Sequence, residues 1–304
     1  MVVTHGSFQR ARGQCALTIG NFDGVHRGHR ALLDRVSAKA GELDLSACVL
    51  TFEPHPREFF AGAAAPARLT RLRDKLELIA AAGVQRVHVA RFDASFAALS
   101  AARFIEEVLV KGLGTRWLLV GRDFRFGASR AGDFALLREA AGRHGFELEA
   151  MPDVLAEGER VSSSTVRAAL QAGDLERAER LLGHPYAISG RVAHGAKLGR
   201  GLGFPTANIV LRRPPPLSGI FVVETRGFGP GVAAVGRRPT VNPVEVPLLE
   251  VHLFDCTGEL YGRHLEVRFL EKLRDEEKYE GLEALRSAIA RDALRAREYF
   301  ARHG

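Results

Sequence analysis

The chain has 304 residues, of which 46% are hydrophobic and 26% charged, and its formal net charge is +7. This composition is typical of an ordinary globular protein, and the length favours two domains over one. The positive charge favours anionic partners but does not choose between nucleotides and nucleic acids.

The N-terminal residues, the apolar runs and the cysteines bear on the cellular location of the protein. Residues 1–13 contain no apolar core, and no apolar run in the chain approaches membrane-spanning length, so neither export nor membrane insertion is expected. Cys15, Cys48 and Cys256 are widely spaced and form no C-x-x-C pair, which argues against a disulfide framework and a structural zinc site. We therefore expect a cytoplasmic protein.

The most informative segment is CALTIGNFDGVHRGHRALLDRV, residues 15–36. An apolar run ends at Gly20, and apolar residues recur at helical spacing after Gly28, namely Leu32, Leu33 and Val36. The segment is therefore predicted to run from a buried strand through a turn into an amphipathic helix.

This strand, turn and helix predict a phosphate-binding site. The first amides of a helix lack partners and stabilise an anion, and glycine allows a phosphate to approach the backbone. His26 and His29, at the helix start, could donate hydrogen bonds to phosphate oxygens as their charge rises in a transition state. The alternative is that both histidines are solvated capping groups. The phosphate site is assigned to Gly20, Phe22, Asp23, Gly24 and Gly28 besides the histidines.

Further strands and helices alternate up to about residue 182. Residues 47–52, 86–90 and 116–121 are predicted strands, and between them lie two helical patterns, Leu72/Leu76/Ile79 and Phe104/Ile105/Val108. This alternation predicts a doubly wound parallel sheet covered by helices on both faces. Such sheets bind ligands at the carboxyl ends of their strands.

Two turns after predicted strands carry further candidate residues. In GRDFRFG, Phe124 and Phe126 could form a platform for a flat heterocycle, with Asp123 accepting a hydrogen bond, or the two rings could simply plug the edge of the sheet. In TFEPHP, His55 could position a second substrate.

A second helix start lies in VSSSTVRAALQAG, residues 161–173. Ser162, Ser163 and Ser164 supply hydroxyl groups, and Arg167, expected in the first turn, could hold phosphate oxygens through two parallel hydrogen bonds. The alternative is that the serines are helix caps and nothing more.

These motifs resemble known families. GNFDGVHRGH resembles the HxGH signature of the nucleotidyltransferase superfamily, and VSSSTVR resembles its ISSTxIR element. The order GNFDGVHRGH, TFEPHP, GRDFRFG and the serine-rich segment resembles the N-terminal half of prokaryotic bifunctional riboflavin kinase/FAD synthetase. The resemblance implies transfer of an adenylyl group from ATP to FMN, with His26 and His29 catalytic and His55, Asp123, Phe124 and Phe126 at the flavin.

From about residue 184 the pattern changes to short apolar runs with period-two alternation and frequent Gly and Pro. It predicts a small antiparallel β-barrel, followed by a helix with Leu282, Leu285, Ile289, Ala293 and Phe300 on one face. We place the boundary between domains of residues 1–182 and 183–304.

Two segments of the second domain carry candidate chemistry. In GRGLGFPTANIVL, Gly203 could approach a phosphate, and Thr206 and Asn208, two residues apart on an extended chain, could face one hard cation. In LLEVHLFD, Glu250 lies between apolar neighbours. It is either a solvated outward residue or, beside a substrate hydroxyl, a general base.

This half resembles the riboflavin kinase domain of the same family. The resemblance implies that Thr206 and Asn208 serve Mg²⁺ and the ATP phosphates, that Glu250 takes the proton of the riboflavin 5′-hydroxyl, and that Arg274 lies near the flavin. In one departure, Ala234 stands where the family usually has Asn, so a hydrogen bond of the pocket wall is expected to be missing.

The resulting expectation is a bifunctional transferase that makes FMN from riboflavin and FAD from FMN, with ATP and Mg²⁺, as a monomer or weak homo-oligomer. Its partners are small molecules, without nucleic acid or membrane. The alternatives are a nucleotidyltransferase for another phosphate acceptor and a non-enzymatic basic RNA-binding protein. The first leaves the barrel residues unexplained, and the second requires interleaved aromatic and basic stripes that the sequence lacks.

Overall fold

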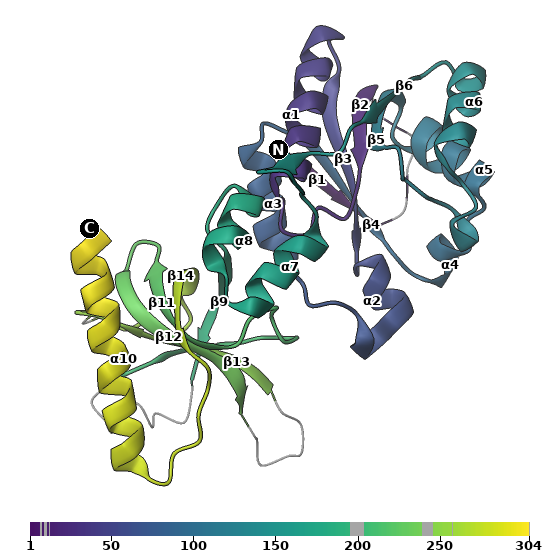
Figure 1. Ribbon diagram of the computed structural model, residues 1–304. Helices are drawn as coiled ribbons and strands as arrows, with labels where there is room; N and C mark the ends of the chain where they lie inside the picture. The colour runs from purple at the N-terminus through teal and green to yellow at the C-terminus, as the bar shows by residue number, and fades with distance from the viewer. Residues whose placement is uncertain are drawn as a thin grey trace. The chain divides into compact units, whose positions relative to one another are not determined.

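The computed structural model describes residues 1–6, 8, 11, 13–194, 204–238, 246–256 and 258–303. The chain divides into two compact units, the first of Met1–Pro66 and Leu72–Val161, the second of Ala67–Arg71 and Ser162–Gly304 (Figure 1). Helices α7 (Ser163–Ala172) and α8 (Leu175–Leu182) are thus grouped with the second unit. The domain boundary at residues 182/183 stays a prediction.

The first unit is built on a six-stranded parallel sheet, which confirms the predicted doubly wound architecture. In spatial order the strands are β1 (Val2–His5), β4 (Arg86–Arg91), β3 (Ser46–Glu53), β2 (Cys15–Ile19), β5 (Thr115–Gly121) and β6 (Glu147–Met151). The two outer strands, β1 and β6, were not predicted, because neither has a fully buried residue and neither forms an apolar run.

Helices cover both faces of this sheet because every central strand is buried on both sides. On β5, Leu118 joins the apolar cluster that contains Leu109 and Leu137, while its neighbour Trp117 packs with Val36 of α1 on the opposite face. The helical elements of the unit are α1 (Arg27–Glu42), α2 (Pro56–Ala61), α3 (Leu72–Ala81), α4 (Ala94–Ala97), α5 (Ala101–Arg103), a π-helical stretch Phe104–Gly112 and α6 (Phe134–His144). Two short strands, β7 (Leu155–Ala156) and β8 (Glu159–Arg160), pair with each other.

The strand order reverses at β2, which has β3 on one side and β5 on the other. In open α/β sheets this reversal point is where ligands bind, at the carboxyl ends of the strands. The chain leaves β2 there and turns through residues 20–26 into α1. The turn with the two histidines therefore lies at the position that the topology favours for a ligand.

The second unit contains a closed antiparallel barrel, as predicted. Its strands, in spatial order, are β10 (Ala207–Val210), β13 (Val246–Leu253), β12 (Gly229–Arg238), β11 (Gly219–Thr225), β14 (His264–Arg274) and β9 (Ala187–Ala193). Phe221 and Phe269 meet edge to face with ring centroids 5.3 Å apart. Val222, the next residue after Phe221, packs instead against Ala293 and Ala296 of the last helix, α10 (Leu282–His303).

Helix α8 packs on β14 through an apolar face that is almost completely buried. The residues of this face, at most 6% exposed, are Leu175, Ala178, Leu181 and Leu182. Among the residues that the structure describes, no helix is long and apolar enough to cross a membrane.

Candidate functional site

The two histidines at the start of α1 stack on one another. His26 is the N-cap residue, and its Nδ1 accepts a hydrogen bond from the backbone N–H of His29 at 3.2 Å. The ring centroids are 3.6 Å apart and the ring planes differ by 14°. Because Nδ1 of His26 is an acceptor, the neutral ring carries its proton on Nε2. Nδ1 of His26 therefore caps the helix, but the residue is buried and not solvated, and its Nε2–H is a hydrogen-bond donor.

The turn before α1 has an unusual backbone. Phe22 and Val25 have φ angles of 48° and 40°, in the left-handed region that costs a non-glycine residue about 1–3 kcal/mol. Gly24, at φ 85°, adopts a positive angle without that cost. Both strained side chains are buried, so packing in the core holds the turn in this shape.

Gly20 and Gly28 lie where the packing around this turn leaves little room for a side chain. A Cβ atom on Gly20 would lie 3.1 Å from the ring of Phe22, and one on Gly28 would lie 3.2 Å from the ring of His26. The ring of Phe22 in turn lies 5.0 Å from that of His29. The two glycines thus allow the rings of Phe22, His26 and His29 to pack closely. The predicted phosphate-site residues lie together in this turn.

Buried polar atoms in the turn have no partner within the described part of the chain. These atoms are Nδ1 of His29 and Oδ1 of Asn21. Burial, followed by electrostatic repulsion from His26 and Lys75, lowers the pKa of His29 well below its usual value. Two charged residues, Asp23 of the turn and Lys75 of α3, are also buried, and each is 2% exposed. Unpaired buried polar atoms are rare in folded proteins, so these two atoms are available to a water molecule or a ligand at this turn.

A cavity of about 780 Å³ begins at the same turn, where Gly20 and Asn21 form part of its wall. Seven phenylalanines form a large part of the remaining wall, namely Phe52, Phe60, Phe92, Phe96, Phe104, Phe124 and Phe126. Arg57, Arg125 and Arg130 also line it, and all three are exposed. The cavity therefore combines an apolar interior suited to a flat ring system with cationic groups suited to an anion.

The structure places the predicted flavin residues of the first unit in different roles. Phe124 and Phe126 stack at 5.6 Å with an interplanar angle of 17°, and Phe126 belongs both to the core and to the cavity wall. Asp123 also lines the cavity, but its exposed carboxylate pairs with Arg160 at 3.1 Å. Nδ1 of His55 accepts the N–H of Arg57 at 3.0 Å and caps α2, and His55 is not among the described lining residues.

Sequence reasoning missed five of the seven phenylalanines and all three arginines of this cavity. Two of the phenylalanines carried a usable signal, because Phe52 lies near the end of β3 and Phe92 directly follows β4. Both positions are at carboxyl ends of strands, where the ligand site was expected.

The serine-rich segment starts α7 in the second unit. Ser162 and Thr165 form a capping box, so Ser162 does cap this helix. Ser163 and Ser164 lie in the first turn, but Arg167 lies in the second turn and not, as predicted, in the first. Its guanidinium donates to the carbonyl oxygens of Ala67 at 2.6 Å and Ser163 at 3.1 Å. That this helix start joins the histidine site stays a prediction.

In the barrel, Asn208 and Glu250 are directly opposite one another on β10 and β13. Leu249 and Val251 are fully buried while Glu250 is partly exposed, so the predicted alternation of this strand is confirmed. On its other side Glu250 faces Ala234 of β12, the residue that departs from the family pattern. Residues directly opposite in such ladders have Cβ atoms about 5 Å apart, so the amide and the carboxylate lie within reach of one ligand.

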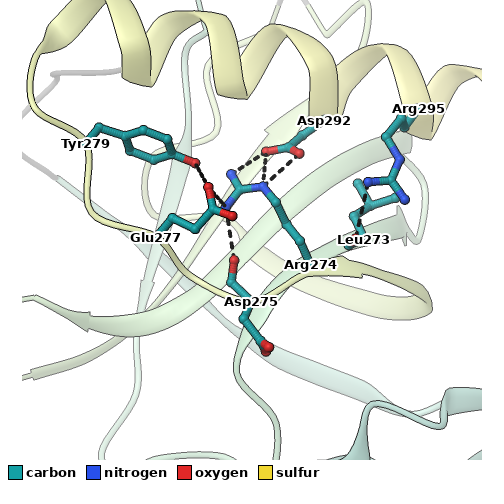
Figure 2. A network of polar contacts seen from close by, with 7 residues as sticks. All are labelled: Leu273, Arg274, Asp275, Glu277, Tyr279, Asp292 and Arg295. Atoms are coloured by element: carbon teal, nitrogen blue, oxygen red, sulfur yellow. Dashed lines mark hydrogen bonds and ion pairs between the residues drawn. The ribbon is translucent and has the colours of Figure 1, made fainter.

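Two further predicted residues have different outcomes. Arg274 is not free to contact a ligand with its whole guanidinium, because it forms an ion pair with Asp292 of α10 at 2.6 Å (Figure 2). Hydrogen bonding to Asp292 raises the pKa of Arg274. Gly203 lies outside the described residues.

Oxygen atoms suited to a hard cation are present beside Glu250. Nδ2 of Asn208 donates to the carbonyl of Thr206 at 3.3 Å, which orients the amide. The hydroxyl of Thr206 and Oδ1 of Asn208 are neutral oxygen donors of the kind that Mg²⁺ accepts when phosphates supply the remaining charge. Within the described ranges no group of three or more His, Cys, Asp and Glu side chains could hold a metal ion.

Comparisons with known proteins divide the chain in the same order as its two sites. Residues 8–165 match the FAD synthetase family, and residues 182–300 match the riboflavin kinase family. Over 301 residues the chain is 51% identical to the bifunctional riboflavin kinase/FMN adenylyltransferase of Escherichia coli, covering 97% of this chain and 96% of that protein. The chain belongs to this bifunctional family.

A second curated relative and a solved structure also match nearly the whole chain. The bifunctional riboflavin kinase/FMN adenylyltransferase of Pseudomonas fluorescens is 50% identical over 287 residues, covering 93% of this chain and 92% of its own. A crystal structure described as a macrolide-efflux protein from Streptococcus pneumoniae matches with a TM-score of 0.81 and 26% identity, over 96% of this chain and 97% of that one. The fold of that structure therefore matches both units of the chain.

Proposed function

We propose that this chain phosphorylates riboflavin to FMN with ATP in its barrel unit and adenylylates FMN to FAD with ATP in its parallel-sheet unit. The observation that carries the proposal is that one chain holds two separate candidate sites in the order of the two matched families. The histidine pair serves one reaction, and the Asn208–Glu250 pair serves the other.

For adenylylation, the aromatic cavity supports binding of the flavin ring of FMN. The FMN phosphate then lies toward Gly20 and Asn21, at the end of the cavity next to α1. One of its oxygens attacks the α-phosphorus of ATP, and pyrophosphate leaves. FMN phosphate is already an anion at neutral pH, so no base is needed. Nε2–H of His26 and the first amides of α1 donate to the oxygens on which negative charge develops.

His29 has a related role in this reaction. Its low pKa keeps the ring neutral at physiological pH. A neutral imidazole donates one hydrogen bond to a phosphate without a proton transfer, which suits a reaction that needs charge stabilisation and no acid. Ser162, Ser163, Ser164 and Arg167 are proposed as further groups at the ATP phosphates.

For phosphorylation, Glu250 is the proposed general base. Its carboxylate takes the proton of the riboflavin 5′-hydroxyl, the oxygen attacks the γ-phosphorus of ATP, and ADP leaves. Thr206 and Asn208 would hold Mg²⁺, and the bound ion would neutralise charge on the ATP phosphates. Asn208 lies opposite Glu250, so the phosphate donor and the hydroxyl are held at adjacent positions of the ladder.

The remaining proposals concern the protein's setting. We propose that it acts in the cytoplasm on small molecules, without nucleic acid, as a monomer or weak homo-oligomer. The three widely spaced cysteines, which favour a reducing compartment, support the location.

One assay tests the proposed function. The purified chain is incubated with riboflavin, ATP and Mg²⁺, and the flavins are separated by chromatography over time. We expect FMN first and FAD afterwards, with ADP released in the first reaction and pyrophosphate in the second. FAD from supplied FMN without any FMN from riboflavin would limit the function to the first unit. Formation of neither flavin would refute the proposal.

A further inference from the structure

A row of side chains crosses the barrel at the level of Glu250. Directly opposite residues of antiparallel strands present their side chains to the same face, and here it is the face on which α10 packs. Across β14, β11, β12, β13 and β10 the row consists of Arg274, Ile220, Ala234, Glu250 and Asn208. Since neighbouring strands lie about 4.8 Å apart, Arg274 lies about 14 Å along the sheet from Glu250.

Arg274, at one end of the row, is fixed by Asp292 of α10. Its Nε donates to Oδ1 at 3.0 Å and its Nη2 donates to Oδ2 at 2.6 Å, as Figure 2 shows. Asp292 is only 5% exposed. A buried carboxylate needs a charged partner, and the paired geometry of the two groups allows little freedom of orientation.

The segment after β14, residues 275–279, folds around this guanidinium. Nη1 of Arg274 donates to the carbonyl oxygen of Asp275 at 3.0 Å and lies 3.8 Å from the carboxylate of Glu277. Tyr279 donates its hydroxyl hydrogen to Glu277 at 3.1 Å, and its ring centroid is 5.8 Å from the guanidinium carbon (Figure 2). The path of the segment therefore depends on the orientation of Arg274.

The same segment lies against the strand next to Glu250. A Cβ atom on Gly236 would overlap the carboxylate of Glu276, so the two residues are in close contact. Gly236 is two residues beyond Ala234 on β12 and shares its face of the sheet. Ala234 lies opposite Glu250. The segment thus forms a wall beside the row.

We propose that Asp292 is a positioning residue of the riboflavin site, because it holds Arg274 and, through Arg274, the 275–279 segment that forms a wall of this site beside Glu250. This inference rests on the proposed function, because it places the 5′-hydroxyl at Glu250. Asp292 touches neither the hydroxyl nor the phosphates, so its loss weakens riboflavin binding and leaves the chemical step intact.

The test uses the full-length chain with Asp292→Asn, which keeps the shape and removes the charge. We expect the KM for riboflavin, and its Kd from quenching of riboflavin fluorescence, to rise at least about tenfold, as expected for loss of a charge-assisted hydrogen bond. The kcat of phosphorylation stays within about threefold, and adenylylation of supplied FMN is unchanged. A purely stabilising role would lower the melting temperature without this split between KM and kcat.

The matched control is Asp255→Asn. Asp255 also connects the barrel to α10, through an ion pair with Arg297 at 3.3 Å, but both side chains are exposed. Exposed pairs contribute little, so both kinetic constants should be unchanged. If Asp292→Asn fails to fold, Arg274→Met combined with Asp292→Leu removes both charges at similar volume, a change that buried ion pairs often tolerate. The same rise in KM is expected.

Two results would overturn the inference. One is a KM and Kd for riboflavin within about twofold of the wild type, and the other is a fall in kcat at unchanged KM. A wild-type chain that does not phosphorylate riboflavin would refute the proposed function itself. An active wild type with an unaffected Asp292→Asn variant refutes only the role of Asp292.

Discussion

Glu250→Gln separates the two interpretations of Glu250 most sharply. Glutamine has the shape of glutamate but cannot accept the proton of the 5′-hydroxyl. If Glu250 is the base, phosphorylation of riboflavin falls about a hundredfold to ten-thousandfold. At about 1.36 kcal/mol per factor of ten, this is about 2.7 to 5.4 kcal/mol of lost transition-state stabilisation.

The structure shows that instability is a poor alternative explanation for such a loss. Glu250 is partly exposed, and glutamine fills nearly the same volume. The substitution removes no buried apolar atom, so the free energy of unfolding should change by less than about 0.5 kcal/mol. A change of this size cannot unfold enough protein to lower activity a hundredfold.

The assay measures riboflavin phosphorylation and adenylylation of supplied FMN separately on the purified variant, together with its melting temperature. Glu224→Gln is the control, because Glu224 is an exposed glutamate of the same barrel with an ion pair to Arg268 at 3.7 Å. We expect the control to retain both activities and Glu250→Gln to lose phosphorylation alone. Near-normal phosphorylation by Glu250→Gln would refute its role as the base.

Three more predictions concern the histidine site and the barrel unit. His29→Asn should lower FAD formation about a hundredfold or more through loss of a transition-state donor, while FMN accumulates. Unchanged FAD output in the chromatographic assay would show that His29 is not part of the site. Because burial lowers the pKa of His29 below its ordinary 6.5, the unfolded chain binds a proton there that the folded protein does not, so His29 makes the folded protein less stable as pH falls below about 6.5. Melting temperatures from pH 7 to 5 should fall less in His29→Asn than in the wild type, and parallel curves would contradict the shift. A fragment starting at Ser162 keeps the packing of α8 on β14. We therefore expect this fragment to make FMN and to melt at a higher temperature than a fragment starting at Gly183. Equal melting temperatures would show that α8 does not stabilise the barrel.

The sequence alone determined the features that depend on neighbouring residues. The apolar run before Gly20, the glycines of the turn and the helical spacing after Gly28 correctly predicted β2, the turn and α1. The alternation around Glu250 correctly predicted a strand with one buried face. The helical spacing and the period-two alternation are both set by local backbone geometry. They can therefore be recognised in the sequence without knowledge of the fold.

Only the tertiary structure decided which distant segments meet. That β2 lies between β3 and β5, that Asn208 faces Glu250, and that Arg274 pairs with Asp292 all follow from strand register and helix docking. The aromatic cavity is likewise assembled from several separate segments. Register is fixed by hydrogen bonds and packing between residues far apart in the chain, and a local pattern carries no record of its partner. For Arg274 the family resemblance implied a place near the flavin. Only the docking of α10 on the barrel showed that its immediate partner is the buried carboxylate of Asp292.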